Sequence, residues 1–231
     1  MIDDRHERRR VTLTFDNGPT PGVTNRVLDV LADRHATATF FVVGTQLQQP
    51  GGQALAARAV AEGHRIGHHT ATHTLQFGAA EDHEAAVAAE ITAVEHDIDA
   101  LAGTSETEGE RLFRPNAAGG ILDRRVFSPA AIRYLRQHRY TCVLWNNLPR
   151  EWENPAGWVD YALEGVARTD WSVVVIHDID TGAMEHLPAF LDGIVAIGAE
   201  FTTGFPDSCV PIRQGEQRFS LSHLTSGDDQ R

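Results

Sequence analysis

The sequence predicts a parallel α/β fold, either a barrel or a doubly wound sheet, and three observations lead to that class. Short apolar runs typical of buried strands alternate with longer segments whose apolar residues recur every three or four positions, as on one face of a helix. This alternation runs through most of the 231 residues without an internal repeat. Hydrophobic residues make up 42% of the chain, which suffices for a sizeable core. We therefore expect one α/β domain.

The expected strands are short and lie between helical segments. They cover residues 11–15, 38–43, 64–67, 112–113, 140–145, 173–176 and 201–203. The clearest helix spans 81–101, where the apolar residues are spaced four, three, four and three apart, namely Val87, Ile91, Val94, Ile98 and Leu101. Three further helices are predicted where a capping side chain precedes proline, at Thr20-Pro21, Ser128-Pro129 and Asn154-Pro155. Alanine-rich 53–62 and the apolar stripe from Met184 to Ile197 complete the set.

The ends of the chain differ from its centre. Residues 1–10 form a basic lead-in before the first strand, and the expected domain spans 11–204. Residues 205–231 are polar and patternless, which predicts a C-terminal tail that is disordered over 222–231. The start of the chain resembles no secretory leader, so a cytoplasmic location is expected, with secretion open if the natural chain begins further upstream.

Charge and composition narrow the classes of partner. The formal net charge of −12 argues against nucleic acid or an anionic membrane surface as a partner. No apolar run reaches the roughly 18 residues that a membrane span needs. The two cysteines, Cys142 and Cys209, do not suggest a disulfide framework. A soluble protein with a small-molecule or oligosaccharide ligand is expected, and the oligomeric state cannot be read from the sequence.

Two segments carry the residues most suited to chemistry. Asp16 and Asn17 stand side by side at the end of the first apolar strand, and His69 and His73 are four residues apart. Carboxylate, amide oxygen and two imidazoles are consistent with an open metal site that keeps a spare acid or base. The plainer interpretation of Asp16-Asn17-Gly18-Pro19 is a turn. All of these residues follow predicted strands, which is where α/β barrels gather their chemistry.

Five short motifs in a fixed order resemble the polysaccharide deacetylase family, the NodB-like metal-dependent amide hydrolases of carbohydrate esterase family 4. The family order is T-F-D-D-G, H-[ST]-x-x-H, R-P-P-Y-G, D-x-x-D-W and L-x-H. The matching segments here are Thr14 to Gly18, His69 to His73, Arg114 to Ala118, Leu148 to Trp152 and Ile176-His177, within roughly residues 11–203. The third and fourth motifs depart from the pattern, because Asn116-Ala117-Ala118 replaces Pro-Tyr-Gly and Glu151 replaces aspartate.

The resemblance implies a distorted (β/α) barrel with fewer than eight parallel strands. It implies that Asp16 is the catalytic base and that Asn17, His69 and His73 hold a divalent metal ion, expected to be Zn²⁺. Asn17 stands where the family has an aspartate ligand. An amide there removes one negative charge, so we expect weaker metal binding and a stronger Lewis acid.

The remaining roles follow from the same resemblance. Arg114 would fix the catalytic aspartate, and the backbone N–H of Ala117 would stabilise the oxyanion. His177 would be the general acid that protonates the departing amine, although a histidine at a strand end can also be a hydrogen-bonded core residue. Glu151 would orient His177 and raise its pKa, and Trp152 would form a wall for the acetyl methyl group.

The expected function is metal-dependent hydrolysis of a C–N amide bond, most simply N-deacetylation of an amino sugar or oligosaccharide. Two alternatives stay open. The altered third and fourth motifs fit the same chemistry on a non-carbohydrate amide or cyclic imide. The Asp-to-Asn change at position 17 also fits a sugar-binding relative without turnover.

Overall fold

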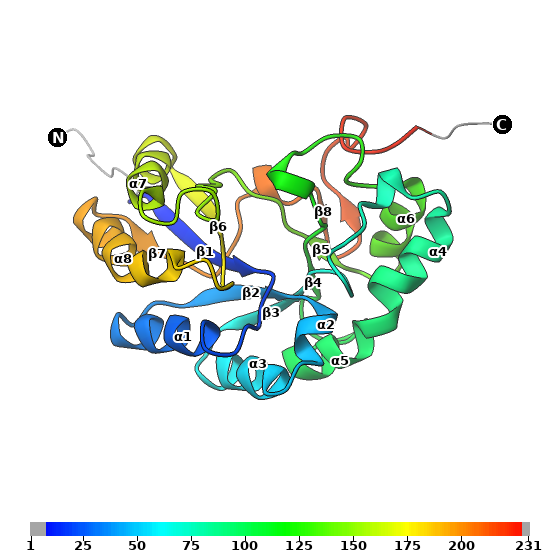
Figure 1. Ribbon diagram of the computed structural model, residues 1–231. Helices are drawn as coiled ribbons and strands as arrows, with labels where there is room; N and C mark the ends of the chain where they lie inside the picture. The colour runs from blue at the N-terminus through cyan, green and yellow to red at the C-terminus, as the bar shows by residue number, and fades with distance from the viewer. Residues whose placement is uncertain (1–7, 228–231) are drawn as a thin grey trace.

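Residues 8–227 are described by the computed structural model, and they form one curved sheet covered by helices on its outer side (Figure 1). The sheet has nine strands. They are β1 (Arg10–Asp16), β2 (Ala38–Val42), β3 (Arg65–His68), β4 (Leu112–Phe113), β5 (Thr141–Cys142), β6 (Trp171–His177), β7 (Glu200–Phe201), β8 (Ile212–Arg213) and β9 (Glu216–Gln217).

Parallel pairing dominates the sheet, in the order β6-β1-β2-β3-β4-β5, with β7 beside the start of β1. β8 and β9 add two short antiparallel strands at the β5 edge. After β5 the chain turns toward β6, where Asn147 forms a parallel bridge with Val174. The structure therefore confirms the expected distorted barrel, with seven parallel strands in the described part of the chain.

The helices follow the strands in alternation, as predicted. They are α1 (Thr24–Asp33), α2 (Gly44–Leu47), α3 (Gly52–Ala61), α4 (His83–Val87), α5 (Ala93–Ala102), α6 (Pro129–Gln137), α7 (Trp158–Arg168) and α8 (Leu187–Ala196). α6 begins as predicted, with the Ser128 side chain accepting a hydrogen bond from the Ala131 N–H. α1 and α7 begin about one turn later than predicted, because short turns follow Pro21 and Pro155. No helix within residues 8–227 is long and apolar enough to cross a membrane.

The helix predicted over 81–101 is present but irregular. Asp82 caps α4 by accepting hydrogen bonds from two backbone N–H groups. Between α4 and α5 lies η2 (Ala88–Thr92), a π-helical turn in which the backbone is wider than in an α-helix. The turn contains Glu90, a carboxylate that is only 4% exposed. This irregularity matters for the site described below.

The predicted C-terminal tail is wrong for residues 205–227. Phe205, Cys209 and Val210 are buried inside the barrel against apolar residues from β2, β4 and β6 and against Val143, which follows β5. Leu221 and Leu224 pack into a second apolar cluster between α4, α6 and β5. These apolar residues have no regular spacing, so the sequence pattern did not reveal them. Residues 228–231 of the segment predicted to be disordered, and 1–7 of the lead-in, lie outside the described residues.

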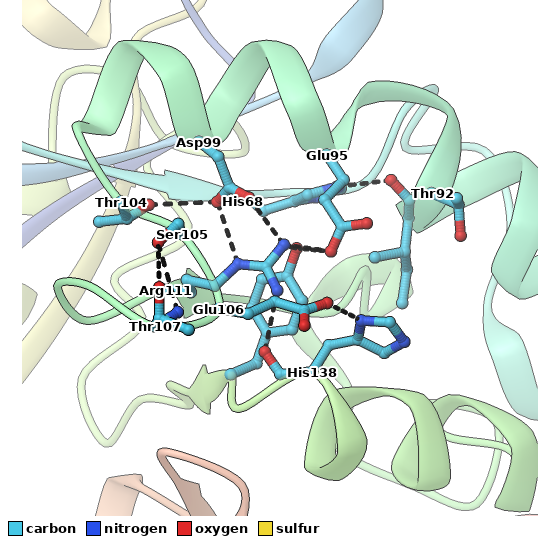
Figure 2. A network of polar contacts seen from close by, with 12 residues as sticks. His68, Thr92, Glu95, Asp99, Thr104, Ser105, Glu106, Thr107, Arg111 and His138 are labelled. Carbon is cyan, nitrogen blue, oxygen red and sulfur yellow. Dashed lines mark hydrogen bonds and ion pairs between the residues drawn. The ribbon is translucent and has the colours of Figure 1, made fainter.

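A buried ion network anchors α5 to the sheet next to β4 (Figure 2). Arg111, which is 3% exposed, pairs with Glu95 and with Asp99 on α5. It also donates hydrogen bonds to the His138 carbonyl at 2.9 Å and the Tyr140 hydroxyl at 3.0 Å. Although burial opposes the charge, these partners raise the pKa of Arg111 above its ordinary value. The network fixes the position of α5 against β4.

Candidate active site

The predicted site residues converge on one pocket of about 240 Å³ at the carboxyl ends of the parallel strands. Seven of the nine line it directly, namely Asp16, Asn17, His69, His73, Ala117, Trp152 and His177. The other two, Arg114 and Glu151, are buried behind the pocket and hydrogen-bond to residues that line it. The pocket lies where the C-terminal ends of β1, β3 and β6 meet, which is the expected place in a barrel.

Asp16 ends β1 and is held by Arg114. One oxygen of its carboxylate accepts a hydrogen bond from Arg114 Nη1 at 2.7 Å, and Asp16 is 3% exposed. Burial alone would raise the pKa of Asp16, but the charge and hydrogen bond of Arg114, together with the charge of His177, outweigh it and lower the pKa below the usual value. Asp16 is therefore ionised at neutral pH, in the form that can accept a proton.

Arg114 is itself fully buried and firmly placed. Its Nε donates to the Val143 carbonyl at 3.1 Å, its Nη1 also donates to Thr14 Oγ1 at 2.7 Å, and its guanidinium lies 4.0 Å from the centre of the Phe41 ring. Its Nη2 has no partner among the described residues. Thr14 lies two residues before Asp16 on β1, and its hydroxyl oxygen helps to hold the Arg114 guanidinium in place. This contact was not predicted from the sequence.

Asn17 begins the loop after β1 in a left-handed conformation with φ of 74°. Its Oδ1 atom is buried and has no hydrogen-bond partner within residues 8–227. A buried carbonyl oxygen without a partner is costly, so an acceptor left open toward a pocket indicates a site for a cation or donor.

His69 presents one ring nitrogen to this cluster in a defined protonation state. Nδ1 lies 2.8 Å from the Arg114 carbonyl oxygen, which can only accept, so Nδ1 carries the proton. Burial lowers the pKa of His69 to about 3, which leaves Nε2 with a free lone pair. That lone pair lies 3.5 Å from the second oxygen of Asp16. Two electron-rich atoms facing each other are unfavourable unless a cation or a donor lies between them.

His73 lies beside His69, with ring centres 4.6 Å apart, and is half-buried. Burial lowers the pKa of His73, so its ring is neutral at neutral pH and can act as a ligand. The described residues contain no group of three or more His, Cys, Asp or Glu side chains arranged to hold a metal ion. The predicted set of Asn17, His69 and His73 has only two such residues, and its third ligand is an amide. Its donor atoms nevertheless fit a divalent ion with nitrogen and oxygen ligands.

His177 ends β6 and is held by Glu151. One carboxylate oxygen of Glu151 accepts hydrogen bonds from the His177 backbone N–H at 2.8 Å and from Nδ1 at 2.7 Å. Burial lowers the pKa of His177, but the hydrogen bond and charge of Glu151 outweigh it and raise the pKa above its usual value. The Trp152 ring stands edge-on to the imidazole at 4.8 Å, with an angle of 88° between the planes. Together they keep a proton on Nδ1 and direct the other edge of the ring to the pocket.

The rest of the pocket wall is apolar. Beyond the polar cluster, the pocket is lined by Pro115, Trp145, Leu148, Val175 and Ile179, together with Ala117, Trp152, Gly119 and Gly120. The backbone at Ala117 is extended, and its N–H donates no hydrogen bond within residues 8–227. The pocket thus has one polar end, where every side chain belongs to the predicted site, and one apolar end.

Two buried carboxylates near the site were not predicted. Glu90 in the π-helical turn hydrogen-bonds to Thr72, within the loop between the two histidines. Asp178 accepts a hydrogen bond from Thr24 and packs against Gly18, and burial raises its pKa to about 7. The sequence did carry a signal for Glu90, which is spaced three residues after Val87 and four before Val94 on the apolar stripe of its helix.

Comparison with known proteins agrees with this geometry. Residues 3–143 match the family model described as polysaccharide deacetylase. The chain belongs to the polysaccharide deacetylase family. It is 32% identical over 176 residues to the peptidoglycan-N-acetylglucosamine deacetylase of Bacillus cereus, covering 73% of this chain and 72% of the relative. It is 35% identical over 175 residues to a chitooligosaccharide deacetylase of a Bradyrhizobium species, covering 74% and 71%.

Solved structures of the family share the fold. A family 4 acetyl xylan esterase from Clostridium thermocellum, solved in complex with a cobalt ion, is 26% identical and superposes with a TM-score of 0.65. The superposition covers 84% of this chain and 87% of the esterase. The polysaccharide deacetylase fold expected from the five motifs is therefore confirmed, including the part of the chain that follows the family match.

Proposed function

We propose that the protein is a metal-dependent deacetylase that hydrolyses the N-acetyl group of an amino sugar or oligosaccharide. The main support is a pair of titratable groups on one pocket whose surroundings shift their pKa values in opposite directions. Arg114 keeps Asp16 ionised, and Glu151 keeps His177 protonated. A held base and a held acid on the same cavity are what amide hydrolysis needs. The deacetylase names of the relatives support the substrate class.

Each protein group has one part in the reaction. Asp16 takes the proton from the attacking water, and Arg114 holds the carboxylate in place while it does so. The N–H of Ala117 is available to stabilise the developing oxyanion. His177 gives its proton to the amine nitrogen as the C–N bond breaks, and Glu151 stabilises the imidazolium before the transfer. The products are a free amine and acetate.

A divalent ion is part of this proposal, and Asn17, His69 and His73 would hold it. The buried and unpartnered Asn17 Oδ1, together with the free Nε2 lone pair of His69, supports this assignment. When bound, the ion would supply Lewis-acid polarisation of the acyl oxygen and of water. We expect zinc, with cobalt as a substitute, because the ligand set mixes imidazole nitrogen with oxygen.

The test is acetate release from defined substrates. Purified protein is stripped with a chelator, reloaded with Zn²⁺ or Co²⁺, and incubated with N-acetylglucosamine oligomers or peptidoglycan. We expect release with metal, none in the stripped protein, and release slowed by roughly 10²–10⁴-fold in Asp16→Asn. Binding of the oligomers without release by the loaded protein would instead identify a sugar-binding relative that lacks turnover.

The apolar end of the pocket supports a second candidate substrate class. Leu148, Val175 and Ile179 offer no side-chain hydrogen bonds for sugar hydroxyls, and Trp145 has only its indole N–H to donate. The same residues could therefore act on a small amide or cyclic imide with an apolar body. Parallel assays with acyclic amides and cyclic imides separate the two, because kcat/KM for the true class should exceed that for the other.

A further inference from the structure

The loop between the two predicted metal ligands has a conformation that needs support. Thr70 and His73 both have positive φ, at 66° and 57°, a region that side chains other than glycine adopt at a cost. Within the loop, the His73 N–H donates to Thr70 Oγ1 at 3.0 Å. That bond fixes the turn locally but does not tie it to the rest of the protein. The rings of His69 and His73 can keep a set relation only if something outside holds the loop.

Gly44 and Thr45 at the start of α2 donate to the Thr70 and Ala71 carbonyls, and Asn116 donates to the His73 carbonyl. The π-helical turn η2 holds the opposite side of the loop, where the backbone N–H groups lie. The Ala71 N–H donates to the Glu90 carbonyl oxygen at 2.8 Å. His68 Nε2 lies 3.1 Å from the Ile91 carbonyl oxygen, and His68 Nδ1 accepts from the Thr70 N–H at 2.9 Å. Two consecutive carbonyls of the turn thus point out of the helix toward the loop. A π turn leaves backbone groups free to bond outside the helix, and such turns recur at functional sites.

The Glu90 side chain completes the connection. One carboxylate oxygen accepts from the Thr72 N–H at 3.0 Å, and the other accepts from Thr72 Oγ1. Glu90 is buried, and both of its oxygens are occupied by the residue that directly precedes His73. Hydrogen bonds to an ionised carboxylate are about twice as strong as neutral ones, so this contact holds the loop more firmly than an amide would.

We propose that Glu90 is a positioning residue that acts through Thr72 and Ala71 to set the orientation of the His69 and His73 imidazoles. The backbone carbonyl and the carboxylate of Glu90 together accept three hydrogen bonds, one from Ala71 and two from Thr72. In its effect on turnover the inference rests on the proposed deacetylase function.

The test compares Glu90→Gln with Glu95→Gln. Glutamine keeps the shape of Glu90 but has only one accepting oxygen, so it cannot replace both carboxylate oxygens that accept from the Thr72 N–H and hydroxyl. Glu95 lies on the same helical segment and binds Arg111, Tyr134 and Tyr140, so its variant loosens the helix without touching the loop. We expect Glu90→Gln to weaken metal affinity and kcat/KM about 10–100-fold, the usual scale for residues that orient ligands. Glu95→Gln should lower Tm and leave metal affinity near the wild-type value.

A second variant tests the path of the effect. Thr72 is exposed, so the Thr72→Val variant should fold. The substitution removes the hydroxyl that donates a hydrogen bond to Glu90. If Glu90 acts through Thr72, the losses of metal affinity in the two single variants and in the double variant are non-additive. Additive losses, or wild-type metal affinity in Glu90→Gln, would overturn the inference.

The failure of this inference is distinguishable from failure of the proposed function. Metal affinity by chelator competition and the ring-nitrogen NMR shifts of His69 and His73 in metal-free protein do not depend on turnover. Perturbed ring shifts in Glu90→Gln, with those of His177 unchanged, support the inference even if no acetate is released. Unchanged shifts of all three rings would count against it even if the wild type is an active deacetylase.

Discussion

Arg111 and Arg114 flank the two-residue strand β4, yet they belong to opposite kinds of environment. Arg111 faces α5 and is fully engaged by two carboxylates, a hydroxyl and a carbonyl. Arg114 lies inside the barrel, where it holds one carboxylate and keeps Nη2 without a partner within residues 8–227. Burial lowers the pKa of Arg114, whereas the partners of Arg111 raise its pKa.

The difference extends to the neighbours of each arginine. Eight buried side-chain atoms lack a hydrogen-bond partner in the described part of the chain. Three belong to predicted site residues, Asn17, Arg114 and Glu151, and two more belong to Asn116 and Asp178, which adjoin site residues in sequence. None belongs to the Arg111 network. Unmet bonding capacity therefore gathers where substrate, water or metal would bind, and saturated ion pairs mark the part that only supports the fold.

The largest effect on turnover should come from the base. Asp16→Asn removes the proton acceptor but keeps the shape, so activity should fall by roughly 10²–10⁴-fold with the fold retained. The matched change in the other region, Asp99→Asn, should leave kcat near that of the wild type. Near-native turnover in Asp16→Asn would move the base elsewhere, with Asp178 as the next carboxylate to test.

The second effect concerns the metal. His69→Ala or His73→Ala should abolish stoichiometric metal and activity, because each removes an imidazole from a three-residue set. Asn17→Asp should tighten metal binding, since it restores a negative charge at the partnerless oxygen. Elemental analysis and chelator competition measure both changes. A full metal complement in His69→Ala would show that the site is elsewhere.

The third effect is selective for the leaving group. His177→Ala should reduce alkyl amide hydrolysis by roughly 10²–10⁴-fold, because an amine leaves only when protonated. An activated aryl ester should be affected much less, because phenolate leaves without a proton. The readout is the ratio of the two rates in wild type and variant. Equal losses on both substrates would leave His177 with a structural or binding role.

The fourth effect is a shift in pH dependence. Burial lowers the pKa of His177, but Glu151, Asp16 and Asp178 raise it above its usual value. The proton needed for catalysis is therefore present at low pH and is lost as pH rises through a pKa above the ordinary value of about 6.5. Glu151→Gln should move the alkaline limb of kcat/KM to lower pH. An unmoved limb would assign that limb to another group.

The smallest effect on turnover should come from the Arg111 network, where the charged groups are all paired. Arg111→Met leaves two half-buried carboxylates without their cation, so unfolding free energy should fall by about 1–3 kcal/mol. Below the new Tm, kcat per folded molecule should stay close to that of the wild type. Denaturant unfolding and turnover measured on the same sample decide this. A collapse of kcat with little loss of stability would contradict the division between the two regions.

Much of the fold and site could be predicted because the signals are local. Strand and helix periods identified the alternation, and five motifs in order identified the residues that converge on the pocket. The sequence also predicted that Asp16 and His177 lie at strand ends, and the structure places both there. Their side chains meet because parallel strands bring their carboxyl ends to one edge of a barrel, whatever the loops between them.

The motif order singled out Arg114, but only the tertiary structure showed the role of Arg111, placed residues 205–227 in the core and brought Glu90 to the histidine loop. No motif marks Arg111, because its partners Glu95 and Asp99 lie on a helix that reaches it only in the folded chain. The C-terminal apolar residues have no period of their own and become a core only by filling a barrel built by other segments. Glu90 lies 18 residues from Thr72, so its hydrogen bonds exist only once the helix has packed against the loop. Short-range pattern determined the elements and the chemistry, and long-range packing decided which polar groups were satisfied.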